Sequence, residues 1–357
     1  MLNLRADERI SIELRELYRR MGYLPYKVNQ FEEYDLYMQN KRFLASEHVL
    51  SFSDMDGKLM ALKPDVTLSI IKNTQDDGEM RKLCYAERVY RVPRGAQGFK
   101  EIMQVGLEVI GALDAYAMGE VLMLAARSLA VISDSWALDI ADLGIVSGIL
   151  SEAELTDGQQ SQLLSLISDK NLHGLSSLCR EWDVDREIAG LLGRLITVYG
   201  PLEQTLPAFE EMKLPQACMG AMENLRALRN MLKAYGISGV NLDFSVVNDM
   251  NYYNGLIFSG FIDGIPQSVL SGGRYDLLMK KMGRRAQAMG FAVYLDQMDR
   301  MADEKAEFDV DVLIAYRDEA QWTDAIAKAQ ELVAGGETVR VQRSGETAIR
   351  SRRTIRL

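Results

Sequence analysis

The feature that most limits how this 357-residue chain can fold is a pair of long strand-like runs placed close together. The first is KLCYAERVYRV at residues 82–92, and the second is KEIMQVGLEVIG at residues 100–111. Apolar residues alternate along both runs, and the segment PRGAQG between them has the proline and glycines typical of a loop. Two such runs around a short loop predict neighbouring antiparallel strands. We therefore expect a fold built on an antiparallel sheet.

The segment ahead of this pair has clear helix and turn patterns. Residues 8–21 place apolar side chains on one face at helical spacing, which predicts an amphipathic helix. Asp56 and Gly57 indicate a hairpin turn between two strand-like runs. Pro64 and Asp65 are typical of a helix start, and we expect a short helix after them.

The pattern changes after the strand pair. Residues 115–132 are helical, and residues 151–235 have helix periodicity with no strand signal, which predicts a helical insertion. Strand patterns return in residues 241–264 and 267–276, so the insertion separates two halves of one sheet domain. Residues 288–301 have the pattern of a strand, or of a strand that leads into a helix.

The last segment predicts one βαβ unit, with a strand at 309–316, a helix at 318–336 and a strand at 338–342. The basic end RSRRTIRL, residues 350–357, is interpreted as a solvated or partner-binding tail. The predicted organisation has four parts: residues 1–114 as the first part of the core, 115–240 as the helical segment and insertion, 241–305 as the second part of the core, and 306–357 as a short α/β unit with a basic tail.

Composition excludes several classes of function. A net charge of −10 and a pI of about 5.0 disfavour broad binding of nucleic acid. The two histidines, His48 and His173, are far apart and are interpreted as ordinary surface or packing residues, so no metal site is predicted. The phosphate-binding patterns GxxxxGK(S/T) and GxGxxG are absent, and no cofactor is predicted. The three cysteines support no disulfide framework. No signal-peptide pattern occurs, and we expect no stretch to match a membrane span in length and apolarity, which predicts a cytoplasmic protein without membrane contact.

Several short stretches together resemble class II aminoacyl-tRNA synthetases, and specifically the catalytic core of histidyl-tRNA synthetase. They are LKPDVT at 62–67, ERVYR at 87–91, MQVGLE at 103–108, NDMNYYNG at 248–255 and SGGRYD at 271–276. The first helix with YKVNQFEEYD at 26–35 resembles the dimer-forming first motif, and MGFAVYLDQM at 289–298 has the place of the third. The resemblance implies an α+β fold, in which helices flank an antiparallel sheet of the class II synthetase type, with a helical insertion and a short C-terminal α/β unit.

The resemblance also implies a histidine-binding site. Asp65 and Thr67 would hold the amino group of histidine, and Arg91 would bind its carboxylate through a two-pronged hydrogen bond. Gln104 and Glu108 would contact the amino group and the imidazole. Three tyrosines would line the imidazole pocket: Tyr252, Tyr253 and Tyr275.

Each of these residues also has a simpler interpretation. Asp65 and Thr67 are typical of a helix cap. Gln104 and Glu108 alternate on one face of a strand and would face solvent, and the paired tyrosines, Tyr252 and Tyr253, would be ordinary strand aromatics. The joint order of acid, hydroxyl, arginine, amide and acid favours the amino-acid pocket.

Four departures from the synthetase pattern point away from catalysis. Asn248 and Gln297 stand where the resembled synthetases have arginines that meet the charge on the α-phosphate. The acidic residue after the second-motif arginine is replaced near Pro93, and the first-motif proline is Asn29. Losing two cations should nearly abolish adenylation.

The sequence therefore looks like the synthetase paralogues that serve as regulatory subunits of short-form ATP phosphoribosyltransferase, in histidine biosynthesis. The resemblance implies a homodimer within a larger hetero-oligomer, a separate catalytic subunit as partner, and feedback inhibition by histidine. Two alternatives remain open. One is a diverged enzyme that activates an amino acid or another carboxylate with ATP, which the retained Arg91 favours. The other is a dimeric scaffold that binds no ligand.

Overall fold

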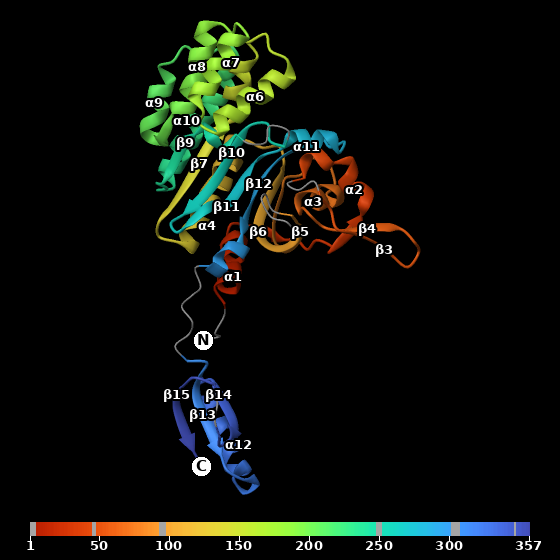
Figure 1. Ribbon diagram of the computed structural model, residues 1–357, viewed down its shortest axis with the longest axis vertical. Helices are drawn as coiled ribbons and strands as arrows, with labels where there is room; N and C mark the ends of the chain where they lie inside the picture. Colours follow the sequence, from red (N-terminus) through yellow and green to blue (C-terminus); the bar gives the residue numbers. More distant parts are fainter. Residues whose placement is uncertain (1–4, 45–47, 93–97, 248–251, 301–307, 346–347) are drawn as a thin grey trace. The chain divides into compact units, whose positions relative to one another are not determined.

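The computed structural model describes the chain except for residues 1–4, 45–47, 93–97, 248–251, 301–307 and 346–347 (Figure 1). The chain divides into two compact units, one of residues Asp7–Met298 and the other of Met1–Ala6 with Asp299–Leu357. The four-part organisation stated above stays a prediction.

A nine-stranded mixed sheet forms the frame of the larger unit. Its strands, in spatial order, are β1 (Leu24–Pro25), β5 (Arg81–Arg91), β6 (Lys100–Gly111), β12 (Gln287–Tyr294), β11 (Ile265–Arg274), β10 (Leu256–Ile262), β7 (Trp136–Asp142), β9 (Val240–Asp243) and β8 (Tyr199–Pro201). The pairs β1–β5 and β7–β9 are parallel, and the other neighbours are antiparallel. The predicted antiparallel pair is confirmed as β5 and β6.

Helices and a small second sheet cover this frame. The helices are α1 (Ala6–Arg20), α2 (Tyr34–Gln39), α3 (Thr67–Asn73), α4 (Ala115–Ile132), α5 (Leu143–Leu150), α6 (Asp157–Ser168), α7 (Leu172–Glu181), α8 (Arg186–Thr197), α9 (Leu202–Glu210), α10 (Met219–Ala234) and α11 (Asp276–Lys281). Short 3₁₀ turns are η1 (Lys41–Phe43), η2 (Gln216–Cys218), η3 (Phe244–Val246) and η4 (Leu295–Arg300). The small antiparallel sheet has the order β2 (Phe31–Glu33), β4 (Leu59–Leu62) and β3 (Ser51–Ser53), which confirms the predicted hairpin.

The two faces of the large sheet have different covers. On one face, α1 and α4 pack with strand residues such as Leu107 and Phe291 in the main core. The two helices are joined there by a 2.9 Å hydrogen bond between the hydroxyls of Tyr18 and Ser128. On the other face, a second core joins the strands to α3 and α11. That second face carries the site described below.

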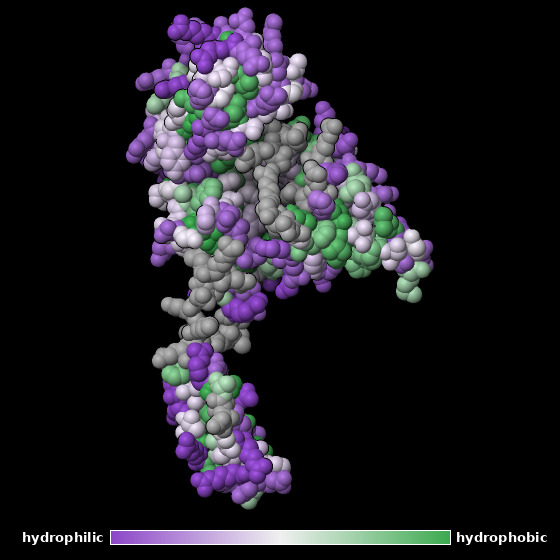
Figure 2. All heavy atoms as spheres, viewed as in Figure 1, coloured by the Kyte–Doolittle hydropathy of each residue, from purple (hydrophilic) through white to green (hydrophobic). Residues whose placement is uncertain are grey.

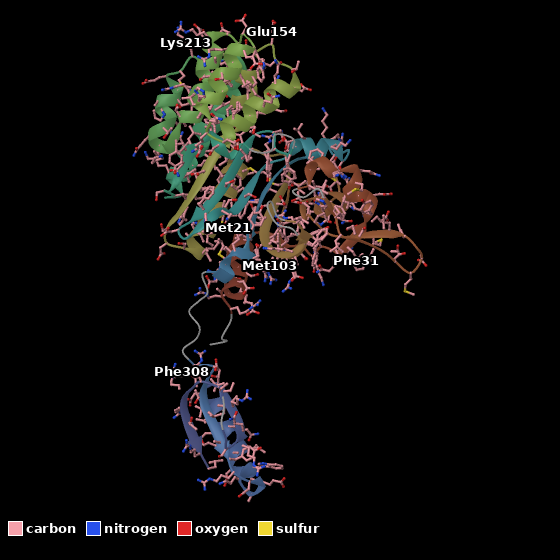
Figure 3. The ribbon with its side chains drawn as sticks, viewed as in Figure 1. Met21, Phe31, Met103, Glu154, Lys213 and Phe308 are labelled. Carbon is pink, nitrogen blue, oxygen red and sulfur yellow. The ribbon has the colours of Figure 1, made fainter. Side chains whose placement is uncertain are left out.

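The predicted helical insertion forms a block, α6–α10, beside β7 and β9 (Figure 1). Hydrophilic side chains cover most of the face of this block that Figure 2 shows, and Glu154 and Lys213 lie at its end remote from the sheet (Figure 3). The expectation of no strand in residues 151–235 is wrong, since β8 lies within it. This strand has three residues and is stabilised by its pairing with β9 rather than by an alternating pattern.

Strand β7 was also not predicted. Its acidic residues, Asp139 and Asp142, interrupt the apolar alternation, yet both are buried. Asp139 accepts a 2.8 Å hydrogen bond from the Asn241 amide, and Asp142 caps α5 by accepting one of 2.8 Å from the Gly144 N–H. Hydrogen-bond donors that are distant in sequence, or that lie beyond the end of the strand, therefore satisfy the two buried carboxylates.

The expectation that no stretch matches a membrane span is also corrected. Helix α4 is long and apolar enough by composition, with a mean hydropathy of 1.5 over 18 residues. Two thirds of it (67%) is buried inside the fold, so it has the features of a core helix that packs on the sheet.

The C-terminal unit has a three-stranded parallel sheet in the order β14 (Val339–Arg343), β13 (Val310–Tyr316) and β15 (Ser351–Arg356). Helix α12 (Trp322–Ala334), preceded by η5 (Glu319–Gln321), completes the predicted βαβ unit. The interpretation of residues 350–357 as a tail is wrong, because Ser351–Arg356 form β15, although the arginines of this strand are exposed as expected. Ile355 packs on the apolar core of this unit, and Arg353 pairs with Glu337 at 2.7 Å.

Candidate functional site

The eight predicted site residues all lie around one cavity of about 170 Å³ on the sheet face opposite α4. They are Asp65, Thr67, Arg91, Gln104, Glu108, Tyr252, Tyr253 and Tyr275. Strand geometry explains part of this convergence, because residues two apart in a strand share a face. Gln104 and Glu108 of β6 therefore project to the same side, opposite Tyr294 and Gly290 of β12.

The start of α3 brings an acid and a hydroxyl to the cavity. An oxygen of Asp65 accepts a 2.8 Å hydrogen bond from the Leu68 N–H in the first turn of α3, which confirms Asp65 as a helix-start residue. The same residue also lines the cavity. Burial raises the pKa of Asp65, while the Leu68 N–H and the charge of Arg91 lower it. Asp65 is thus a structural residue of the helix start and a carboxylate available to a ligand.

Glu108 is the most buried acid at the cavity, with 2% of its surface exposed. One oxygen accepts a 2.8 Å hydrogen bond from the Thr67 hydroxyl, and the other accepts a 2.5 Å bond from the Tyr275 hydroxyl. Burial raises the pKa of Glu108 to about 8, against the lowering effect of these two donors, and the nearby charge of Asp65 adds to the rise. The alternative that Glu108 and Gln104 face solvent is wrong, since Gln104 is also only 5% exposed.

Tyrosines form the aromatic wall of the cavity. The ring centroids of Tyr252 and Tyr253 are 4.6 Å apart, and those of Tyr252 and Tyr275 are 5.9 Å apart. Burial raises the pKa of Tyr252 and of Tyr275 well above the ordinary value, so both hydroxyls keep their protons and can donate. The alternative that Tyr252 and Tyr253 are strand aromatics is wrong, because both precede β10. Such rings offer a flat apolar surface with a polar tip.

Arg91, the last residue of β5, is the one cation among the described residues that line the cavity. Its guanidinium carbon lies over the ring of Tyr294, 5.5 Å from the ring centroid. The Tyr294 hydroxyl is 2.5 Å from the Ser271 hydroxyl, and either can be the donor. The cavity therefore combines two carboxyl groups with one guanidinium.

Sequence analysis missed seven residues that line the cavity: Phe43, Tyr85, Ser271, Gly290, Phe291, Ala292 and Tyr294. Gly290 and Ala292 could have been found from the strand register, since they lie opposite Glu108 and Gly106 on β6. A Cβ atom at Gly290 would overlap Glu108 Oε2 and the Leu107 carbonyl oxygen. Tyr294 lies within the stretch MGFAVYLDQM at 289–298, but sequence analysis gave it no role at the site.

The structure describes only some of the positions at which the sequence departs from the synthetase pattern. Gln297 lies in η4, where its amide donates a 3.5 Å hydrogen bond to the Ser268 carbonyl oxygen, and it is not among the described lining residues. The predictions about Asn248 and Pro93 lie outside the described residues. Within the described part of the chain, no three His, Cys, Asp or Glu side chains gather as metal ligands would.

Sequence and structure comparisons both find proteins described as ATP phosphoribosyltransferase regulatory subunits or histidyl-tRNA synthetases. The ATP phosphoribosyltransferase regulatory subunit of Acetivibrio thermocellus is 28% identical over 321 residues, which cover 87% of this chain and 77% of that one. A structure from Bacillus halodurans C, described as an ATP phosphoribosyltransferase regulatory subunit/histidyl-tRNA synthetase, has a TM-score of 0.84 and 24% identity, over 98% of this chain and 93% of that one.

A chain in an ATP phosphoribosyl transferase complex from Thermotoga maritima has a TM-score of 0.65 and 20% identity, over 83% of this chain and 98% of that one. These structural likenesses establish the fold, including the expected class II synthetase-like α+β architecture. The family model for histidyl-tRNA synthetase matches residues 3–298, and the chain belongs to this family.

Proposed function

We propose that this chain is the non-catalytic regulatory subunit of a short-form ATP phosphoribosyltransferase, and that histidine binds in its cavity as the feedback effector. The name of the Acetivibrio thermocellus relative, which matches over most of both chains, supports the regulatory role. The Thermotoga maritima complex supports a separate catalytic subunit as partner. The likeness to the dimer-forming first motif supports a homodimer within a larger hetero-oligomer.

The observation that carries the effector is the placement of Glu108 and Arg91 in one small cavity. A free amino acid has an ammonium and a carboxylate, and each needs a partner of opposite charge once it leaves water. Arg91 offers in-plane donors to the carboxylate, and Asp65 and Glu108 offer acceptors to the ammonium. Tyrosine rings and the Gln104 amide suit the flat, polar imidazole.

Cavity size and charge favour binding over adenylation. A volume of about 170 Å³ lies below the range of roughly 300–1,000 Å³ that is usual for drug-sized ligands, so one amino acid suits it better than an amino acid with a nucleotide. Adenylation also requires fixed cations near the α-phosphate. The described lining residues supply Arg91 alone, and the carboxylate of the amino acid would occupy it.

The test is an assay of phosphoribosyltransferase with a short-form catalytic subunit from the same source, with and without this chain, across a histidine titration. We expect the chain to raise the rate and to add sensitivity to histidine. Glu108→Gln should shift inhibition to higher histidine concentrations. Glu331→Gln, the same change on the exposed part of α12, should match the unaltered chain.

Two results would overturn the proposal. If the chain neither associates with the catalytic subunit nor changes its rate, the regulatory role fails. Histidine-dependent exchange of pyrophosphate into ATP would instead support the alternative, a diverged amino-acid-activating enzyme.

A further inference from the structure

We propose that Tyr294 is a positioning residue, whose ring supports the Arg91 guanidinium so that Arg91 can bind the carboxylate of the amino acid in the cavity. This inference rests on the proposed function, because it takes histidine as the ligand. It adds a residue, Tyr294, to which sequence analysis gave no role, and it assigns that residue to one group of the ligand.

Tyr294 is fixed at both ends of its side chain. Its backbone closes β12, paired with β6 opposite Gln104. Its hydroxyl is 2.5 Å from the hydroxyl of Ser271, on β11, which also lines the cavity. Two strands of the sheet therefore hold the ring at the rim of the cavity, and it can act as a rigid support.

The position of the Arg91 side chain leaves it able to bind an anion. Its guanidinium lies over the Tyr294 ring, with the central carbon 5.5 Å from the centroid. Within the described part of the chain, no carboxylate accepts a hydrogen bond from Arg91. Arg91 is near enough to Asp65 for its positive charge to lower the pKa of the Asp65 carboxyl group, so the guanidinium acts electrostatically on a residue of the cavity.

Stacking and hydrogen bonding use different parts of a guanidinium. An aromatic ring can stack on the flat face of a guanidinium, whereas the five N–H donors point outward in the plane. The Tyr294 ring can therefore hold Arg91 without using the donors that a carboxylate needs. Without the ring, the long side chain must be ordered by the ligand itself, and this lowers affinity.

Isothermal titration calorimetry of the full chain with histidine and with L-histidinol tests whether Tyr294 acts on binding of the ligand's carboxylate or on ligand binding in general. L-histidinol keeps the ammonium and the imidazole but has a hydroxymethyl group in place of the carboxylate. We expect Tyr294→Leu to weaken histidine about twofold to thirtyfold, the range of a cation–π contact, and to change histidinol less than twofold. Tyr294→Phe keeps the ring and should lose much less.

A double-mutant cycle tests the link to Arg91. Arg91→Ala should remove most of the preference for histidine over histidinol, and Tyr294→Leu should then have no further effect. Ser271→Ala, which frees the tyrosine hydroxyl, should weaken histidine slightly and leave histidinol unchanged. If Tyr294→Leu does not fold, Ser271→Ala still tests the inference through the difference between its effects on histidine and on histidinol.

Two other outcomes overturn the inference, and they differ in what they imply. If Tyr294→Leu weakens both ligands equally, the ring is only a wall of the cavity, and the proposed function stands. If the unaltered chain binds no histidine, the proposed effector and this inference fail together.

Discussion

Two buried glutamates on neighbouring strands, Glu87 of β5 and Glu108 of β6, are stabilised in different ways. One oxygen of Glu87 accepts a 2.5 Å hydrogen bond from the ammonium of Lys63, which is fully buried. Its other oxygen accepts a 3.0 Å bond from the Val28 N–H. Glu108 has two partners as well, but both are neutral hydroxyls.

The difference separates a structural acid from the one that we propose binds the ligand. Lys63 compensates the charge of Glu87 within the protein, and the pair links β5 to the segments that contain Lys63 and Val28. The partners of Glu108 orient its carboxyl group but leave an ionised form without a hydrogen-bonded cation, and its pKa is about 8. A cationic ligand group in the cavity would supply the missing charge.

The largest effect should come from Lys63→Met. This change leaves Glu87 buried without its cation, and breaking a buried pair in this way typically costs about 3–5 kcal/mol of unfolding free energy. Denaturant unfolding followed by circular dichroism measures the loss.

The double variant Lys63→Met with Glu87→Gln is the matched control. It removes both charges and keeps an acceptor for the Val28 N–H, so it should recover most of the loss. If both variants lose the same free energy, packing of the lysine stem rather than charge explains Lys63, and the contrast with Glu108 weakens.

The second prediction concerns how the unfolding free energy of the ligand-free protein depends on pH. The folded-state pKa of Glu108, about 8, exceeds the ordinary value of 4.5, so the folded protein keeps a proton that the unfolded chain loses. Its contribution to stability is therefore fully present below about pH 4.5 and is lost as the pH rises towards about 8.

Glu108→Gln cannot ionise, and it should escape this loss. We expect the variant to match the unaltered protein near pH 4.5 and to be more stable by a few kcal/mol near pH 8, since each pKa unit corresponds to about 1.4 kcal/mol. Thermal unfolding across this range measures the difference. A difference that does not change with pH would mean that Glu108 ionises as readily in the folded protein as in the unfolded chain.

The third prediction is the opposite effect of the same variant on binding. Glu108→Gln removes a charged acceptor, and hydrogen bonds to charged groups contribute about 1.5–3 kcal/mol, so histidine affinity should fall roughly 10-fold to 150-fold. Titration in buffers of different ionisation enthalpy adds a second observable. Near pH 7 the unaltered protein should release more protons on binding than the variant, because the ligand ammonium favours ionised Glu108. Equal affinity of the two proteins would show that Glu108 does not meet the ligand's charge.

The cavity could be predicted from sequence because its chemistry lies in short stretches. Asp65, Arg91 and Glu108 each belong to a motif, and their order along the chain indicates the family. Alternating apolar runs likewise identified β5 and β6, since each follows the period of a strand.

Three features that sequence analysis missed, β15, β7 and the place of Tyr294, share one cause: residues distant in sequence decide the structure there. Strand β15 looks like a solvated tail because its arginines pair with Asp311 and Glu337 only in the folded unit. Strand β7 contains carboxylates whose partners include Asn241, about a hundred residues away. Tyr294 gains its place at the cavity from sheet register and from Ser271, and neither can be read from a local pattern.

The smallest predicted effect tests how closely the sheet supports Glu108. In Gly290→Ala the added Cβ would overlap Glu108 Oε2 and the Leu107 carbonyl oxygen, so we expect a loss of about 1–3 kcal/mol in stability together with weaker histidine binding. Gly190→Ala is the same change inside α8, where a Cβ meets open space, and it should stabilise the protein by about 0.5–1 kcal/mol without affecting binding. Denaturant unfolding and titration with histidine measure both variants. If Gly290→Ala binds histidine normally, the carboxyl group of Glu108 can move aside without losing the ligand, and the hydroxyls of Thr67 and Tyr275 do not fix the position in which it binds.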